Sequence, residues 1–116
     1  MCHVLVIEDD FFISDYIVQL VEASGATSIS QAVSQEEAID QARQHRPELI
    51  MSDVQLIEGT GPLAVQAIIA ELGPIPVIFV TGTPEACEPC DAPAVVLGKP
   101  INEREIADHF RQLAPV

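Results

Sequence analysis

The sequence His3-Val4-Leu5-Val6-Ile7-Glu8-Asp9-Asp10 joins a nearly continuous apolar run to three acids. Such an apolar run is typical of a strand that is covered on both faces, as in a parallel sheet between two layers of helices. Four further β-rich segments follow along the chain, and most of the stretches between them carry apolar residues at helical spacing. This alternation predicts a doubly wound, flavodoxin-like α/β fold with five parallel strands in the order 2-1-3-4-5.

The predicted strands cover residues 3–7, 27–31, 48–52, 76–80 and 94–97, and the predicted helices cover residues 11–23, 34–45, 63–72 and a last segment after Asn102. The second strand is the most polar, which places it at the edge of the sheet. Ser34 and Asn102 are predicted to cap the helices that follow them. The stretch 83–93 contains three prolines and no apolar stripe, so the fourth helix of the series is predicted to be short or irregular.

The length of the chain indicates how many domains it forms, and its charge excludes some classes of binding partner. A chain of 116 residues is expected to form a single domain, and 18 acidic against five basic residues give a net charge of −13. This balance argues against binding to nucleic acid or to anionic lipid, since both need clustered Lys and Arg. No apolar run is long enough for a membrane span, and residues 1–5 do not predict a secretory signal. The sequence predicts a cytoplasmic monomer with reduced cysteines.

Polar residues follow four of the predicted strands, at the edge of the sheet where ligands bind in this fold. They are Glu8, Asp9 and Asp10 after the first strand, Asp53 after the third, Thr81 after the fourth and Lys99 after the fifth, and Gly82 and Pro100 stand next to the last two. Neighbouring carboxylates repel each other unless a proton or cation compensates them, and oxygen ligands favour Mg²⁺ (or Mn²⁺). Together with a hydroxyl and a lysine, this set is suited to phosphoryl transfer onto an aspartate. Asp10 is assigned mainly to helix capping.

Four segments at consecutive strand ends, Val4–Asp10, Ser52–Val54, Phe79–Gly82 and Gly98–Pro100, resemble the receiver domain of two-component response regulators. The resemblance implies that Asp53 is the phosphoacceptor and that Glu8 and Asp9, with the backbone carbonyl of Gln55, bind the metal beside it. It also implies that Thr81 is the switch hydroxyl, that Lys99 binds the phosphoryl group, and that the Lys99–Pro100 peptide is cis. Gly82 leaves room for the phosphodonor.

The segment Pro76–Thr83 is similar to the PFxFATG[Y] segment of alphaproteobacterial single-domain receivers, although it differs at Val77, Val80 and Thr83. This similarity implies a histidine kinase of the HWE type, or a histidine phosphotransferase, as the phosphodonor, and a role in the general stress response. Val96 stands where most receivers carry an aromatic residue or His that reports phosphorylation.

The predicted function is a single receiver domain over residues 1–116 without an output domain. It signals through a downstream protein partner or serves as a phosphate relay or sink, and it is not a turnover enzyme. Three alternatives stay open: a flavodoxin-like cofactor binder, a phosphatase with an aspartyl intermediate, and a receiver cut from a longer protein. Cys87 and Cys90 form a C-x-x-C pair for which no metal or redox role is predicted, and His3, His45 and His109 are interpreted as structural or surface residues.

Overall fold

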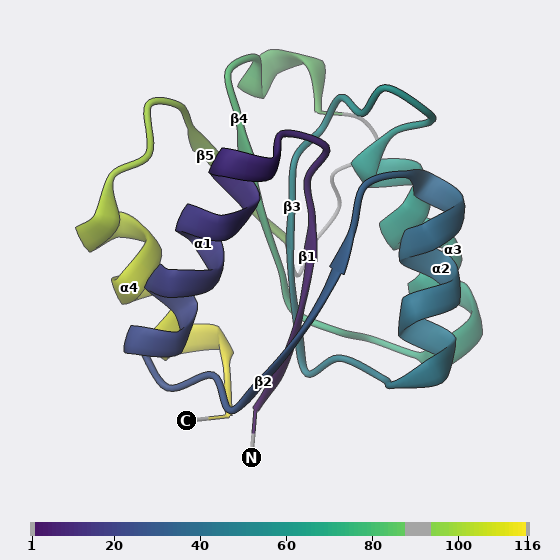
Figure 1. The fold of residues 1–116 in the computed structure, drawn as a ribbon, viewed down its shortest axis with the longest axis horizontal. Coiled ribbons are helices and arrows are strands. Elements are labelled where there is room, and N and C mark those ends of the chain that lie inside the picture. Colours follow the sequence, from purple (N-terminus) through teal and green to yellow (C-terminus); the bar gives the residue numbers. More distant parts are fainter. Residues whose placement is uncertain (1, 88–93, 116) are drawn as a thin grey trace.

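The computed structural model describes residues 2–87 and 94–115 and contains one five-stranded parallel sheet in the order β2-β1-β3-β4-β5. The strands are β1 (His3–Ile7), β2 (Ser28–Ala32), β3 (Leu49–Ser52), β4 (Val77–Thr81) and β5 (Ala94–Gly98). In Figure 1, α1 (Phe11–Ala23) and α4 (Glu103–Leu113) cover one face of the sheet, and α2 (Gln35–Gln44) and α3 (Gly61–Leu72) cover the other. The predicted fold class and strand order are therefore confirmed.

The interior strand β1 contributes side chains to the core on both faces of the sheet. All five of its residues are buried. Val4 and Val6 belong to the apolar cluster beneath α1 and α4, whereas Leu5 and Ile7 belong to the cluster beneath α2 and α3. Successive side chains of a strand point to opposite faces, so a strand that is apolar throughout is the residue pattern that a doubly covered sheet requires.

Each of the four helices begins at a side chain that caps its free N–H groups. Asp10 accepts hydrogen bonds from the N–H groups of Phe12 and Ile13 at 3.0 and 3.2 Å, which confirms its assignment to capping. The capping residues of α2, α3 and α4 are Ser34, Thr60 and Asn102. The sequence interpretation missed the Thr60 cap, and α3 consequently begins at Gly61, two residues earlier than predicted.

The connection between β4 and β5 is irregular, as predicted, in its described part. It contains one 3-10 turn, Pro84–Ala86, before Cys87. Cys87 is disulfide-bonded, so the expectation that all cysteines are reduced is wrong for this residue, whereas Cys2 is a free, buried thiol. Cys90 lies outside the described residues.

His3 supports the structural interpretation of the histidines. Its ring is buried, lies 2.7 and 2.8 Å from the hydroxyls of Ser28 and Ser30, and stacks on His45 with the ring centroids 3.5 Å apart. These contacts are at the amino ends of β1 and β2, the opposite edge of the sheet from the acidic residues. Among the described residues, no helix is long and apolar enough to cross a membrane.

Candidate functional site

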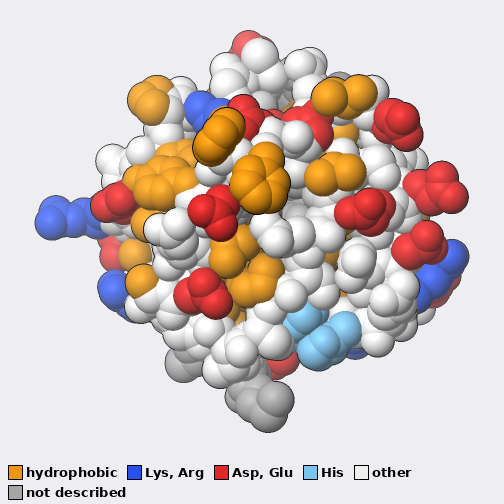
Figure 2. All heavy atoms as spheres, in the orientation of Figure 1, with side chains coloured by type: hydrophobic (Ala, Val, Ile, Leu, Met, Phe, Trp, Pro, Cys, Tyr) orange, Lys and Arg blue, Asp and Glu red, His pale blue; other side chains and the backbone are white. Residues whose placement is uncertain are grey.

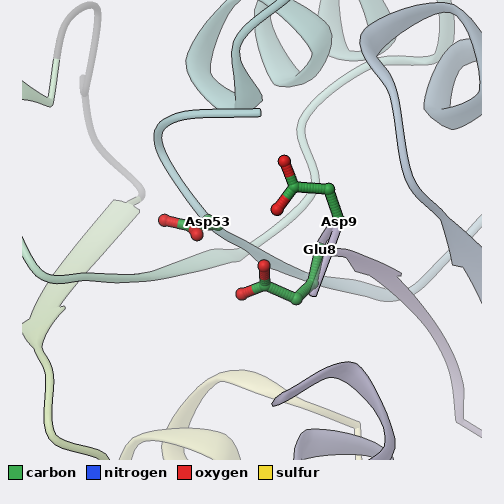
Figure 3. A group of neighbouring side chains, drawn as sticks. All are labelled: Glu8, Asp9 and Asp53. Atoms are coloured by element: carbon green, nitrogen blue, oxygen red, sulfur yellow. The ribbon is translucent and has the colours of Figure 1, made fainter. Parts of the chain in front are cut away.

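Three carboxylates meet at the carboxyl edge of the sheet. Glu8 and Asp9 follow β1, Asp53 follows β3, and one oxygen of each lies within 4.8 Å of the others. Figure 3 shows the side chains of the three acids around a common space between the ends of these strands. The strands are direct neighbours with Ile7 opposite Ser52, and the Asp53 N–H donates to the Ile7 carbonyl at 2.9 Å. The strand order thus produces the convergence that the sequence predicted.

Lys99 joins this cluster from the end of β5. Its Nζ lies 3.1 Å from Asp53 Oδ2 and 3.3 Å from Glu8 Oε1. The Lys99 N–H donates to the Thr81 carbonyl at 2.9 Å, which continues the β4–β5 pairing into the site. The Lys99–Pro100 peptide is cis, as predicted. The ammonium group therefore bridges the carboxylates of two different strands.

The side chains of this cluster are partly buried, and their total charge is negative. Burial and the nearby charge of Asp53 raise the pKa of Glu8 from 4.5 to about 7, although the Asp10 N–H and Lys99 favour its ionised form. Burial disfavours the charge of Lys99, but its hydrogen bond to Asp53 and the charge of Glu8 outweigh burial and raise the pKa of the amine. One ammonium facing three carboxyl groups leaves uncompensated negative charge.

The donor set fits a hard divalent cation, because it consists of carboxylate oxygens alone. Asp9 is held in place by the β3–α3 loop, since its Oδ2 accepts the Ile57 N–H at 2.6 Å. Gln55 lies in the same loop and pairs with Thr60 in an isolated antiparallel bridge. Its carbonyl as a further metal ligand stays a prediction.

Thr81 and Gly82 lie at the end of β4. Thr81 is buried, and its hydroxyl accepts the Thr83 N–H at 3.1 Å and lies 3.3 Å from the Thr83 hydroxyl. The Thr81 hydroxyl is thus hydrogen-bonded within its own loop, and its role as a switch stays a prediction. A Cβ added at Gly82 would meet no heavy atom within 4 Å, which agrees with the expectation of open space there.

Three groups that contact the candidate site were missed by the sequence interpretation: the Ser52 hydroxyl, the Ile57 N–H and the tightly enclosed Gly61. The Ile57 N–H is a backbone group that every residue except proline carries, so the residue type at position 57 gives no signal. Gly61 gave one available signal, because glycine is a poor residue for the first turn of a helix.

Comparison with known proteins identifies the family. The response regulator receiver domain family matches residues 4–111, and the chain belongs to this family. It is 32% identical over 107 residues to the phyllosphere-induced regulator PhyR of Methylorubrum extorquens, covering 90% of this chain and 40% of that protein. It is 42% identical over 81 residues to the polar-differentiation response regulator DivK of Brucella anthropi, covering 67% of this chain and 64% of DivK.

Solved structures agree with this assignment. The receiver domain of PhyR from Erythrobacter litoralis superposes with a TM-score of 0.86 at 30% identity, covering 97% of this chain and 88% of that one. A protein-glutamate methylesterase of Nitrosospira multiformis is 34% identical over 89 residues, which is 25% of its length. The chain spans a quarter to about two thirds of the curated relatives named here. The chain is a response regulator receiver domain that is similar to those of PhyR and DivK, and the family resemblance seen in the sequence is confirmed.

Proposed function

We propose that this receiver domain accepts a phosphoryl group on Asp53 from a histidine kinase or histidine phosphotransferase. The observation that carries the proposal is the position of Lys99 Nζ, 3.1 Å from Asp53 and 3.3 Å from Glu8 inside a cluster of three carboxylates. Glu8, Asp9 and Asp53, with the Gln55 carbonyl, would hold Mg²⁺ or Mn²⁺, which supplies positive charge next to the incoming phosphoryl oxygens.

The protein groups have separate roles in the proposed transfer. An oxygen of the Asp53 carboxylate attacks phosphorus, the bond from phosphorus to the donor histidine breaks, and the histidine nitrogen keeps the bonding electron pair. Lys99 donates hydrogen bonds to the phosphoryl oxygens and neutralises part of their charge. The Thr81 hydroxyl leaves the Thr83 N–H and donates to the phosphoryl group, which moves the loop that begins at Thr83. Val96 is too small to replace the aromatic switch of most receivers, so the movement of this loop would carry the signal.

A protein donor fits the surface around Asp53. The six exposed large apolar side chains of the described residues are Phe11, Phe12, Tyr16, Val33, Ile57 and Leu63. All six lie in α1 or in the segments that follow β2 and β3, and most lie at the edge of the sheet that holds Asp53. Figure 2 shows hydrophobic and acidic side chains intermingled on one face of the molecule. A donor that covers this edge would offer apolar contacts and basic side chains around its histidine.

The relatives and the segment Pro76–Thr83 support a finer biological role, which is also part of the proposal. The similarity of Pro76–Thr83 to the PFxFATG[Y] segment supports an HWE-type kinase as the donor. Several relatives are PhyR proteins, one of them described as an anti-anti-sigma factor, which supports a role in a general stress response. The proposed unit is a cytoplasmic, monomeric receiver domain, residues 1–116, that binds a downstream protein or serves as a phosphate relay or sink. It is a phosphoacceptor and not a turnover enzyme.

Intact-mass spectrometry tests this function with acetyl phosphate as the donor. The wild-type chain should gain one phosphoryl group in Mg²⁺ and none in EDTA, and Asp53→Asn should gain none under either condition. Asp15→Asn, which changes an exposed acid of α1, should be labelled like the wild type. Labelling of Asp53→Asn at the wild-type level would refute the assignment.

A further inference from the structure

A chain of hydrogen bonds connects the Ser52 hydroxyl to the carboxylate of Asp53. Ser52 is buried to 2% exposure, and its Oγ donates to the backbone carbonyl of Asp53 at 2.7 Å. The same peptide group ends in the Val54 N–H, which donates to Asp53 Oδ1 at 2.7 Å. Since a peptide group is planar, a bond that fixes its carbonyl also fixes the direction of its N–H. Bonds in such a chain polarise one another.

Gly61 packs closely against the same Asp53 carbonyl, beside the Ser52 hydroxyl. A Cβ at Gly61 would lie 1.8 Å from the Asp53 carbonyl oxygen and 2.3 Å from Ser52 Oγ. The Gly61 N–H donates to the Val54 carbonyl at 3.0 Å. The peptide groups on both sides of Val54 are therefore held, one by the hydroxyl of Ser52 and the other by the N–H of Gly61. Any side chain at position 61 would displace the backbone of Asp53.

We propose that Ser52 and Gly61 are positioning residues for Asp53, an inference that rests on the proposed function. Asp53 Oδ1 is held by the Val54 N–H and Oδ2 by Lys99 Nζ, so the plane of the carboxylate depends on the direction of the Val54 N–H. Ser52 sets that direction through the carbonyl, and Gly61 provides the close approach that keeps the peptide in place. A displacement of about 1 Å at a reacting group can cost about 100-fold in rate.

Ser52→Ala tests the proposal, because it removes the hydroxyl and adds no volume. At saturating Mg²⁺, the rate of labelling by acetyl phosphate should fall about tenfold. The amide proton of Val54 should also shift upfield in the NMR spectrum, since its bond to the carboxylate is weakened. Ser14→Ala is the matched control, because Ser14 is also buried and its hydroxyl accepts a hydrogen bond from Gln31 Nε2 at 2.9 Å, between α1 and β2. Ser14→Ala should change neither the rate nor the Val54 signal.

Two results would overturn the proposal. One is a Ser52→Ala rate within twofold of the wild type with an unmoved Val54 signal, and the other is an equal effect of Ser14→Ala. Gly61→Ala should lower the labelling rate further than Ser52→Ala. The double variant should not recover the wild-type rate, because the added Cβ at position 61 still meets the Asp53 carbonyl oxygen. Recovery in the double variant would show that Gly61 only makes room for the hydroxyl. Because Gly61→Ala also threatens folding, Ser52→Ala decides the proposal. A wild-type chain that takes no label would instead refute the proposed function.

Discussion

Replacing Glu8 by Gln should stabilise the metal-free protein at alkaline pH. Glu8 is a buried carboxyl beside Asp53, and burial followed by the charge of Asp53 raises its pKa from 4.5 to about 7. Because the folded chain binds this proton more tightly than the unfolded chain, stability is lost as the pH rises from about 4.5 to about 7. Glutamine has nearly the same shape as a protonated Glu and carries no charge, so the variant escapes this loss.

The size of the effect follows from the shift in pKa. At about 1.4 kcal/mol per pKa unit, the ionised Glu8 costs on the order of 3 kcal/mol at pH 8. The amide gives up one favourable contact, because the Asp10 N–H donates to Glu8 Oε2 at 3.1 Å and an NH₂ group placed there does not accept it. This loss is worth about 1 kcal/mol. The net gain for Glu8→Gln is therefore about 2 kcal/mol at pH 8, and it should disappear near pH 5.

Urea unfolding in EDTA, at pH values from 5 to 8.5, measures this difference. A slope of about 2 kcal/mol/M converts the gain into a midpoint shift of about 1 M at pH 8. Glu22→Gln, at an exposed position of α1, should leave the midpoint unchanged. In excess Mg²⁺ the wild type should be the more stable of the two proteins, because its Glu8 carboxylate binds the ion and the amide of the variant binds it more weakly. A Glu8→Gln chain that is less stable than the wild type at both ends of the pH range would refute the reasoning.

Three other substitutions probe the rest of the site and the helix caps. Lys99→Ala should destabilise the metal-free chain by about 2 kcal/mol in urea unfolding at pH 8, since it leaves buried carboxylates without their ammonium; an unchanged midpoint would contradict this. Thr81→Ala should accelerate hydrogen exchange of the Thr83 amide about fivefold, corresponding to one lost hydrogen bond of about 1 kcal/mol; unchanged exchange would show that the bond is absent in solution. Asn102→Ala should cost about 1 kcal/mol, because the Glu105 N–H loses its cap; an equal urea midpoint would rule out a contribution from this cap.

The sequence predicted the elements whose residue types carry a strong physical preference. β1 was found at its predicted residues, His3–Ile7, because an unbroken apolar run suits a strand buried on both faces. The caps at Ser34 and Asn102 follow from the hydrogen-bonding capacity of their side chains. The convergence of Glu8 with Asp53 followed from the strand order, since neighbouring parallel strands end at the same edge.

The contacts that orient the acids could not be predicted from the sequence, because they depend on backbone groups and on the conformation of loops. The Ile57 N–H reaches Asp9 only because the β3–α3 loop folds back over the site, and every residue except proline carries such an N–H. The bond between Thr81 and the Thr83 N–H also depends on loop conformation. The start of α3 was misplaced because Thr60, a capping residue, was assigned to the loop.

Mapping the modified residue is the most direct test of the central claim, that Asp53 is the phosphoacceptor. The chain would be phosphorylated with acetyl phosphate and Mg²⁺, reduced with borohydride, which converts an acyl phosphate to an alcohol, and digested for peptide mass spectrometry. The proposed function predicts homoserine at position 53 and unmodified Glu8 and Asp9. Homoserine at position 9 or 10, with position 53 intact, would contradict it.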